Sequence, residues 1–172
     1  IAKQLKCHID QNQLLPAVQS AYRANRLAET AVLKVNSGIL MAVDSGDLSV
    51  VVLLDLSAAF DTVDQEILLR RLSVSCGLDG LALDWFRSYL TNREHFVFHD
   101  GVFPSRAELA CEVPQGSVLC PVLFTLYTSD IAGLVNSHGF GCHLYADDTQ
   151  IYGRCKATET AGLEESLATC LE

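Results

Sequence analysis

The sequence predicts an α+β fold in which helices pack on an antiparallel central sheet. Two observations predict the sheet: a β-rich run over residues 50–54, and two strand-like stretches that flank Asp147 and Asp148 as in a tight hairpin. A third observation predicts the helical layer. Five apolar residues recur at helical spacing, and we expect all of them to face the core: Ala28, Val32, Val35, Ile39 and Val43.

The run over residues 50–54 is continuously apolar and ends at Asp55. Continuous rather than alternating hydrophobicity is typical of a central strand covered on both faces. An aspartate at the end of such a strand is costly unless it is solvated, hydrogen-bonded or bound to a cation. Asp55 is therefore either a turn-capping residue or a carboxylate at a functional cleft. Asp147 and Asp148 leave a similar choice, because solvated turns are a common place for aspartate.

Local signals predict the remaining elements. Asp64 is a predicted helix N-cap, and a turn at residues 113–117 leads into an apolar helix. The predicted elements are helices over residues 65–75 and 80–93, a hairpin of 96–103 with 107–113, one long helix from Val118 to residues 136–139, and a final helix over 157–172.

Composition and charge limit the class of protein. The chain has 172 residues, of which 49% are hydrophobic, enough for one domain with a small N-terminal helical lobe. Its net charge of −9 argues against holding nucleic acid by bulk positive charge. Metal ions that bridge carboxylates and phosphates are still compatible with that charge. The apolar runs are too short to cross a bilayer.

The cysteines and the chain ends indicate an intracellular fragment. Seven cysteines, an odd number with no C-x-x-C spacing, are expected to be reduced and mostly buried: Cys7, Cys76, Cys111, Cys120, Cys142, Cys155 and Cys170. The chain starts without Met and ends in a predicted helix that looks unfinished. We therefore expect it to be part of a longer protein.

Four motifs follow one another along the chain. They are QSAYR at residues 19–23, LLDLSAAFDTVD at 53–64, VPQGSVL at 113–119 and YADDTQ at 145–150. In this order they resemble a fingers motif and the three catalytic motifs of the reverse transcriptase palm. The resemblance is closest to the enzymes of non-LTR (LINE-type) retrotransposons, and it runs from about residue 10 to residue 160.

The resemblance implies an RNA-directed DNA polymerase that extends a DNA primer on an RNA template. Such in-line phosphoryl displacement uses two divalent cations, which carboxylate oxygens bind well. By resemblance, Asp55 and Asp147 are bridging ligands, Asp148 is a weaker supporting one, and Leu56 belongs to the same metal-binding set. The expected cofactor is a pair of Mg²⁺ ions, with Mn²⁺ as a substitute.

Four further residues are implied to contact nucleotide or template. Phe60 matches the position under the sugar of the incoming deoxynucleoside triphosphate, where a ring excludes a 2′-hydroxyl; the alternative is a core phenylalanine. Gln115 and Gly116 match contacts to the nascent base pair and template, and their alternative is an ordinary strand-to-helix turn. Arg23 matches a fingers arginine that meets the triphosphate, and its alternative is a solvated surface residue.

Two residues depart from the family pattern. Glu112 and Cys120 stand where the family usually carries glycine, and both add bulk near the expected nucleotide site. They favour a second hypothesis, an inactive remnant of a decayed retroelement copy that retains the fold. A phosphatase of the haloacid dehalogenase type is disfavoured, because its second aspartate would fall at Ser57.

The resemblance also implies an organisation and a set of partners. Residues 1–47 are expected to form part of the fingers and residues 48–172 the palm, with the thumb outside the chain. The expected partners are RNA template, DNA primer, and the rest of the retroelement polyprotein in cis, including its thumb and endonuclease. No membrane is expected, and target-primed activity of the parent element implies the nucleus.

Overall fold

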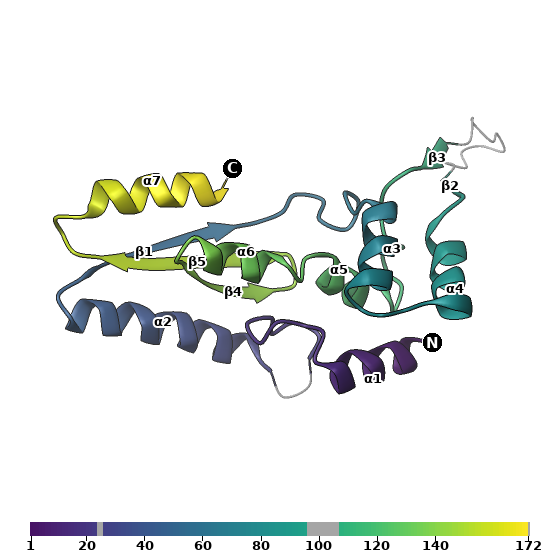
Figure 1. Ribbon diagram of the computed structural model, residues 1–172, viewed down its shortest axis with the longest axis horizontal. Helices are drawn as coiled ribbons and strands as arrows, with labels where there is room; N and C mark the ends of the chain where they lie inside the picture. Colours follow the sequence, from purple (N-terminus) through teal and green to yellow (C-terminus); the bar gives the residue numbers. More distant parts are fainter. Residues whose placement is uncertain (24–25, 96–106, 172) are drawn as a thin grey trace, which may run out of the picture. The chain divides into compact units, whose positions relative to one another are not determined.

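The computed structural model describes residues 1–23, 26–95 and 107–171 (Figure 1). Contacts divide the chain into two compact units. The helical unit consists of Ile1–Leu14 and Ala58–Tyr127, and the sheet unit consists of Leu15–Ser57 and Thr128–Glu172. Each unit is therefore built from two separate stretches of chain. The division into fingers (residues 1–47) and palm (residues 48–172) was predicted from the resemblance and differs in kind from this division by contacts. It stays a prediction.

The helical unit contains four helices and one short β-pair in its described part. These are α1 (Ala2–Asn12), α3 (Gln65–Val74), α4 (Gly80–Leu90), α5 (Cys120–Tyr127), β2 (Arg93–His95) and β3 (Ala107–Leu109), with β2 and β3 antiparallel. Its fully buried side chains include Val63, Leu68, Leu72, Leu90, Val113 and Leu123. β2 and β3 pair over residues 93–95 and 107–109. The first strand of the predicted hairpin, residues 96–103, lies outside the described residues.

The predicted start of α3 is confirmed. Asp64 has an extended backbone, and its Oδ1 accepts a hydrogen bond from the Ile67 N–H at 2.9 Å. This side chain satisfies one of the N–H groups that a helix leaves unpaired in its first turn. Ser117 acts similarly at α5, where its Oγ accepts a hydrogen bond from the Cys120 N–H at 3.1 Å.

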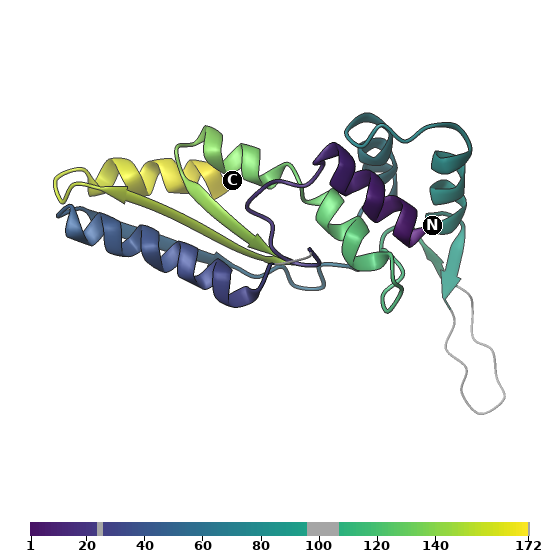
Figure 2. The ribbon, with the colours of Figure 1, turned by 90° about the horizontal axis from the view of Figure 1, so that it is seen from below.

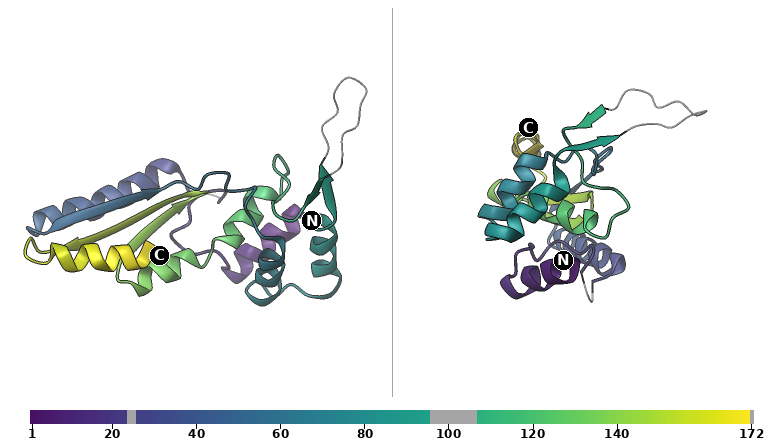
Figure 3. Two further views of the ribbon diagram at one scale, coloured as in Figure 1. Left: turned by 90° about the horizontal axis from the view of Figure 1, so that it is seen from above. Right: turned by 90° about the vertical axis from the view of Figure 1, so that its right-hand side faces the viewer.

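The sheet unit is a three-stranded antiparallel sheet between helices. Its strands are β1 (Leu48–Leu54), β4 (Gly141–Tyr145) and β5 (Asp148–Cys155), in the order β1-β5-β4. Figure 2 shows the strands between α2 (Ala28–Asp44) and α7 (Thr160–Leu171), and Figure 3 shows α7 running along β5. The predicted α+β fold with an antiparallel sheet is confirmed.

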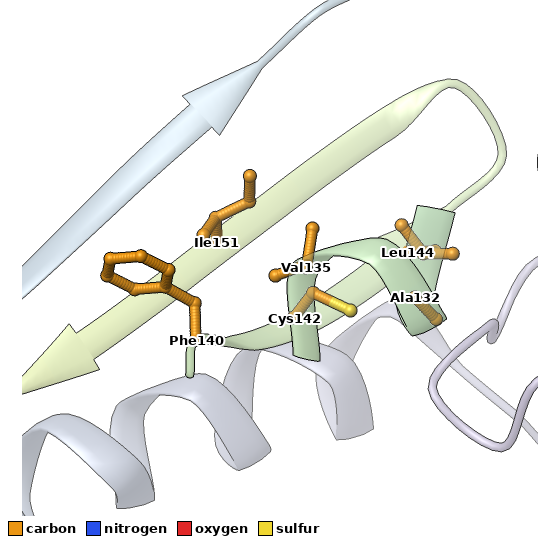
Figure 4. Packing of buried hydrophobic residues seen from close by; sticks show 6 residues of the cluster. All are labelled: Ala132, Val135, Phe140, Cys142, Leu144 and Ile151. Atoms are coloured by element: carbon orange, nitrogen blue, oxygen red, sulfur yellow. The ribbon is translucent and has the colours of Figure 1, made fainter. Parts of the chain in front are cut away.

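The core of the sheet unit lies on the face that packs against α7 and α6 (Ile131–Ser137). A cluster of buried residues from α6, β4, β5 and the position just before β4 forms it, and Figure 4 shows their side chains: Ala132, Val135, Phe140, Cys142, Leu144 and Ile151. Leu163, Leu167 and Cys170 of α7 pack against this cluster. Among the described residues, no helix has both the length and the apolar character needed to span a bilayer.

α2 buries a face that matches the predicted one only in part, since Val35 is buried as expected and Ile39 is half-buried. The buried side chains of this helix include Ala31, Val35 and Ala42. Val32 and Val43, which were expected in the core, are 54% and 59% exposed. Two of the buried residues, Ala31 and Ala42, are small. At Gly38, a Cβ atom would lie 3.9 Å from the Tyr152 ring, an ordinary contact distance.

β1 lies at the edge of the sheet, so the prediction of a central strand covered on both faces was wrong. The strand pairs with β5 along its whole length. On its outer face, Leu53 is 72% exposed and Val51 is also exposed. A continuous apolar run indicates that a strand is hydrophobic. It does not indicate whether the strand lies at the centre or at the edge of the sheet.

The long helix predicted from Val118 is broken. α5 ends at Tyr127 and α6 begins at Ile131. The intervening Thr128, Ser129 and Asp130 have short polar side chains that compete with helical backbone hydrogen bonds. The chain passes from the helical unit to the sheet unit at this break.

The seven cysteines are less buried than predicted. Cys76, Cys120 and Cys142 are buried, whereas Cys7 and Cys111 are exposed. Burial is the main cause that raises the pKa of each of the three buried thiols. Since the thiolate is the reactive form, these three behave as packing residues.

Candidate active site

The strand end and the hairpin bring predicted catalytic residues to one end of the sheet. Leu54, the last residue of β1, pairs with Thr149 of β5, and Asp55 follows directly. Asp148 is the first residue of β5 and pairs with Tyr145 of β4. Continuing the β1–β5 register by one residue places Asp55 opposite Asp148. Because side chains alternate along strands, these two carboxylates belong to the same face of the sheet.

Asp147 lies in the two-residue turn between β4 and β5, so the predicted tight hairpin is confirmed. Ala146, the first residue of this turn, has a φ of 56°. This left-handed conformation costs a residue with a Cβ atom about 1–2 kcal/mol of conformational free energy. Such strain persists only where surrounding contacts hold the backbone, and it is concentrated at functional sites.

The charge and exposure of these carboxylates fit cation binding. Asp55 and Asp148 are exposed, and Asp147 is half-buried. Within the described residues, none of the three forms an ion pair with a basic side chain. Carboxylate oxygens are the ligands that Mg²⁺ prefers. In the described part of the chain, no three or more His, Cys, Asp or Glu side chains lie close enough together to hold a metal ion. Leu56 is exposed just beyond Asp55.

A short segment, residues 18–20, runs beside β4, and we call it the strap. The Ser20 N–H donates to the Leu144 carbonyl at 2.9 Å, and the Leu144 N–H donates to the Val18 carbonyl at 3.1 Å. The strap therefore covers the outer edge of the strand that leads into the Asp147 turn. The sequence motif at residues 19–23 indicates part of this segment, but not its place beside β4.

The strap also carries a buried polar pair. The Ser20 hydroxyl lies 3.0 Å from Nε2 of His143 on β4. Burial lowers the pKa of the His143 imidazole, and the charges of Lys34 and Arg26 lower it further. No local sequence signal indicates this pair, because its members are 123 positions apart.

Arg23 links the strap to the chain that precedes it. One of its guanidinium nitrogens donates to the carbonyl oxygens of Pro16 and Gln19, at 2.9 and 3.4 Å. The side chain is half-buried, so the alternative of a freely solvated residue does not apply. Arg26 makes a comparable bond to the Ala17 carbonyl. The expected contact of Arg23 with a triphosphate stays a prediction.

Three of the expected nucleotide contacts belong to the helical unit. The half-buried Phe60 packs its ring against Phe124, with ring centroids 4.9 Å apart. Gln115 and Gly116 form an exposed turn in which Gly116 has a φ of 81°, a conformation that favours glycine. Ser117 stabilises this turn by accepting a hydrogen bond from the Tyr89 hydroxyl at 2.8 Å. The roles of these residues toward nucleotide and template stay predictions.

The backbone of Glu112 explains why a glycine suits this position. Its φ is 90°, which strains any residue with a Cβ atom. Its Oε1 lies 2.8 Å from a guanidinium nitrogen of Arg93, a contact that is an ion pair rather than an aligned hydrogen bond. The negative charge that Glu112 adds is therefore balanced within the helical unit. Cys120, the other departure from the family pattern, is buried at the start of α5.

The strain at Glu112 leads to a stability prediction. We expect Glu112→Gly to have a free energy of unfolding about 1 kcal/mol higher than Glu112→Ala, because both variants lose the ion pair but only glycine relieves the backbone. Urea denaturation of both variants measures the difference. The control is Glu66, an exposed residue in α3, where alanine should be the more stable substitution by about 1 kcal/mol. Equal stabilities at residue 112 would contradict the prediction.

The α+β fold with an antiparallel sheet agrees with the fold expected for a reverse transcriptase. A sequence profile of the family described as reverse transcriptase (RNA-dependent DNA polymerase) matches residues 1–172. The chain belongs to the reverse transcriptase family.

Similar proteins of Drosophila melanogaster give the same family. The RNA-directed DNA polymerase from mobile element jockey is 28% identical over 165 residues, which cover 92% of this chain and 18% of that protein. The probable RNA-directed DNA polymerase from transposon X-element is 30% identical over 131 residues, covering 76% and 14%. The predicted resemblance to LINE-type retrotransposon enzymes is confirmed. The chain spans less than a fifth of the length of these two relatives.

A solved structure was also matched. It is the partial Cas6-RT-Cas1–Cas2 complex, with 25% identity, coverage of 80% of this chain and 24% of that chain, and a TM-score of 0.38.

Proposed function

We propose that the chain is the palm-bearing part of an RNA-directed DNA polymerase that extends a DNA primer on an RNA template. The observation that carries the proposal is the strand register. The β1–β5 ladder ends at the Leu54–Thr149 pair, directly before Asp55 and directly after Asp148, and Asp147 lies in the adjoining turn. This arrangement supports a shared site for the three carboxylates. In this proposal residues 48–172 act as palm and residues 1–47 as part of the fingers. The parent protein would supply the thumb and endonuclease and would act in the nucleus.

In this proposal the carboxylates of Asp55, Asp147 and Asp148 hold two divalent cations, with Leu56 in the same set. When bound, the cations would neutralise charge on the attacking and leaving oxygens of an in-line displacement. The role of the protein residues is to bind the cations and to orient the carboxylates that hold them. Asp55 directly follows β1, Asp148 is the first residue of β5, and Asp147 lies in the turn before it. Attachment to a sheet supports the precise placement that phosphoryl transfer needs.

Template-dependent DNA synthesis tests the proposal. The full-length parent polymerase should incorporate deoxynucleotides onto a DNA primer annealed to RNA, in the presence of Mg²⁺ or Mn²⁺, and EDTA should stop incorporation. Reverting Glu112 and Cys120 to glycine in the same protein separates two kinds of failure. Incorporation only after reversion would identify a damaged copy. No incorporation by either protein would favour the inactive remnant.

The proposed role of Phe60 leads to a specificity prediction. Phe60→Ala should keep deoxynucleotide incorporation and relax discrimination against ribonucleotides by about tenfold or more, because the ring supplies only volume at the sugar. The ratio of kcat/KM for the two substrates measures this. Phe60→Tyr retains the bulk and serves as the control. An unchanged ratio in Phe60→Ala would mean that contact with Phe124 is the sole role of the ring.

A further inference from the structure

The side chain of Gln19 lies in the strap and reaches the turn that carries Asp147. Gln19 is only 1% exposed. Its Oε1 accepts hydrogen bonds from two backbone N–H groups, from Ala21 at 2.9 Å and from Ala146 at 3.4 Å. Because both partners are donors, the accepting atom must be the amide oxygen, which fixes the orientation of the amide.

The hydrogen bond from Gln19 gives the Ala146 N–H a partner that the strand ladder does not supply. The last ladder pair is Tyr145 with Asp148, so the Ala146 N–H lies beyond the ladder. A half-buried N–H without a partner is costly, and Ala146 is already strained at a φ of 56°. One buried side chain thus holds the strained residue that immediately precedes Asp147.

The backbone of Gln19 is held in place because the strap is hydrogen-bonded to β4. Backbone bonds on either side of Gln19 attach Val18 and Ser20 to Leu144 of β4. The Arg23 guanidinium also donates to the Gln19 carbonyl. Since the backbone of Gln19 is held on the strand that enters the turn, its amide oxygen is pre-positioned for the Ala146 N–H.

We propose that Gln19 is a positioning residue that fixes the Ala146–Asp147 turn, and thereby the direction of the Asp147 carboxylate. The metal-binding part of this inference rests on the proposed function. The holding of the turn does not, because it concerns only backbone geometry. Supporting groups of this kind typically change metal affinity by about tenfold or more when they are removed.

Three variants test the role of Gln19. Gln19→Met keeps the length of the side chain but has no oxygen to accept a hydrogen bond. Gln19→Glu keeps an accepting oxygen. Ser20→Ala is the matched control, because it removes the neighbouring bond to His143 from the same strap without touching the turn. The 172-residue chain serves for all measurements.

The first readout is amide hydrogen exchange of Ala146, measured by NMR. Gln19→Met should speed exchange at Ala146 by about tenfold or more, whereas Ser20→Ala should leave it unchanged. Unchanged exchange in Gln19→Met would overturn the proposal. If Gln19→Met does not fold, Gln19→Glu decides, since protected Ala146 supports the proposal and rapid exchange opposes it.

The second readout is Mn²⁺ affinity, measured by electron paramagnetic resonance. Gln19→Met should weaken binding by about tenfold, and both Gln19→Glu and Ser20→Ala should bind more tightly than Gln19→Met. Equal affinity in Gln19→Met and Ser20→Ala would overturn the link to Asp147. If the unchanged chain binds no Mn²⁺, the proposed metal site fails, and the exchange readout still decides whether Gln19 holds the turn.

Discussion

Replacing Asp147 with Asn in the full-length parent polymerase should lower primer extension by about a thousandfold or more, equivalent to about 4 kcal/mol of transition-state stabilisation. Asparagine keeps the shape of aspartate but lacks the negative charge that holds a divalent cation. Because Asp147 lies in a turn and not within the strand ladder, the substitution should leave the fold intact. Single-turnover extension on an RNA template measures the loss.

Asp47→Asn is the matched control for this experiment. It makes the same change of charge, and Asp47 directly precedes β1, at the opposite end of that strand from Asp55. We expect extension by Asp47→Asn to equal that of the unchanged protein. If Asp147→Asn extends the primer as well as this control, Asp147 is not a metal ligand and the proposed site is wrong.

Phe124→Ala should destabilise the helical unit by about 3–5 kcal/mol, the usual cost of emptying a core site of an aromatic ring. Phe124 is 1% exposed and contacts the ring of Phe60. Urea unfolding followed by tryptophan fluorescence measures this loss. The chain has one tryptophan, Trp85, and it lies in the helical unit against Phe86 and Tyr89, so the signal reports that unit.

Val118→Ala is the control for the Phe124 experiment. Val118 belongs to the same unit but is 74% exposed, so its truncation should change the free energy of unfolding by less than about 0.5 kcal/mol. A similarly small change in Phe124→Ala would show that the helical unit relaxes around the missing ring. Phe60 would then have no rigid neighbour, and its proposed role at the sugar would lose its support.

Elements with strong local signals were predictable from sequence. Asp64 caps α3 as expected, because a cap depends on residues only three positions apart. Asp55 at a strand end and the hairpin around Asp147 were also predictable, since each depends on a short apolar run and its boundary. These local signals are enough to place the candidate carboxylates at strand ends and turns.

Features set by distant contacts could not be predicted in this way. The face that α2 buries includes the small residues Ala31 and Ala42 as well as Val35, and the spacing of the larger apolar residues did not indicate them. The edge position of β1 depends on sheet order, which involves strands about a hundred residues away. The bond from Gln19 to Ala146 spans 127 positions, so neither residue indicates its partner locally.

The interleaved build of the two units has a consequence for folding kinetics. β1 and β5 must find each other although the whole segment 58–127 of the helical unit lies between them in sequence. Closing so long a flexible loop carries an entropy cost that grows with its length, and non-local strand pairing is slow. Collapse of segment 58–127 into a folded body shortens the effective loop. We therefore expect that early folding of the helical unit speeds the pairing of β1 with β5, and that damage to the core of the helical unit slows formation of the sheet.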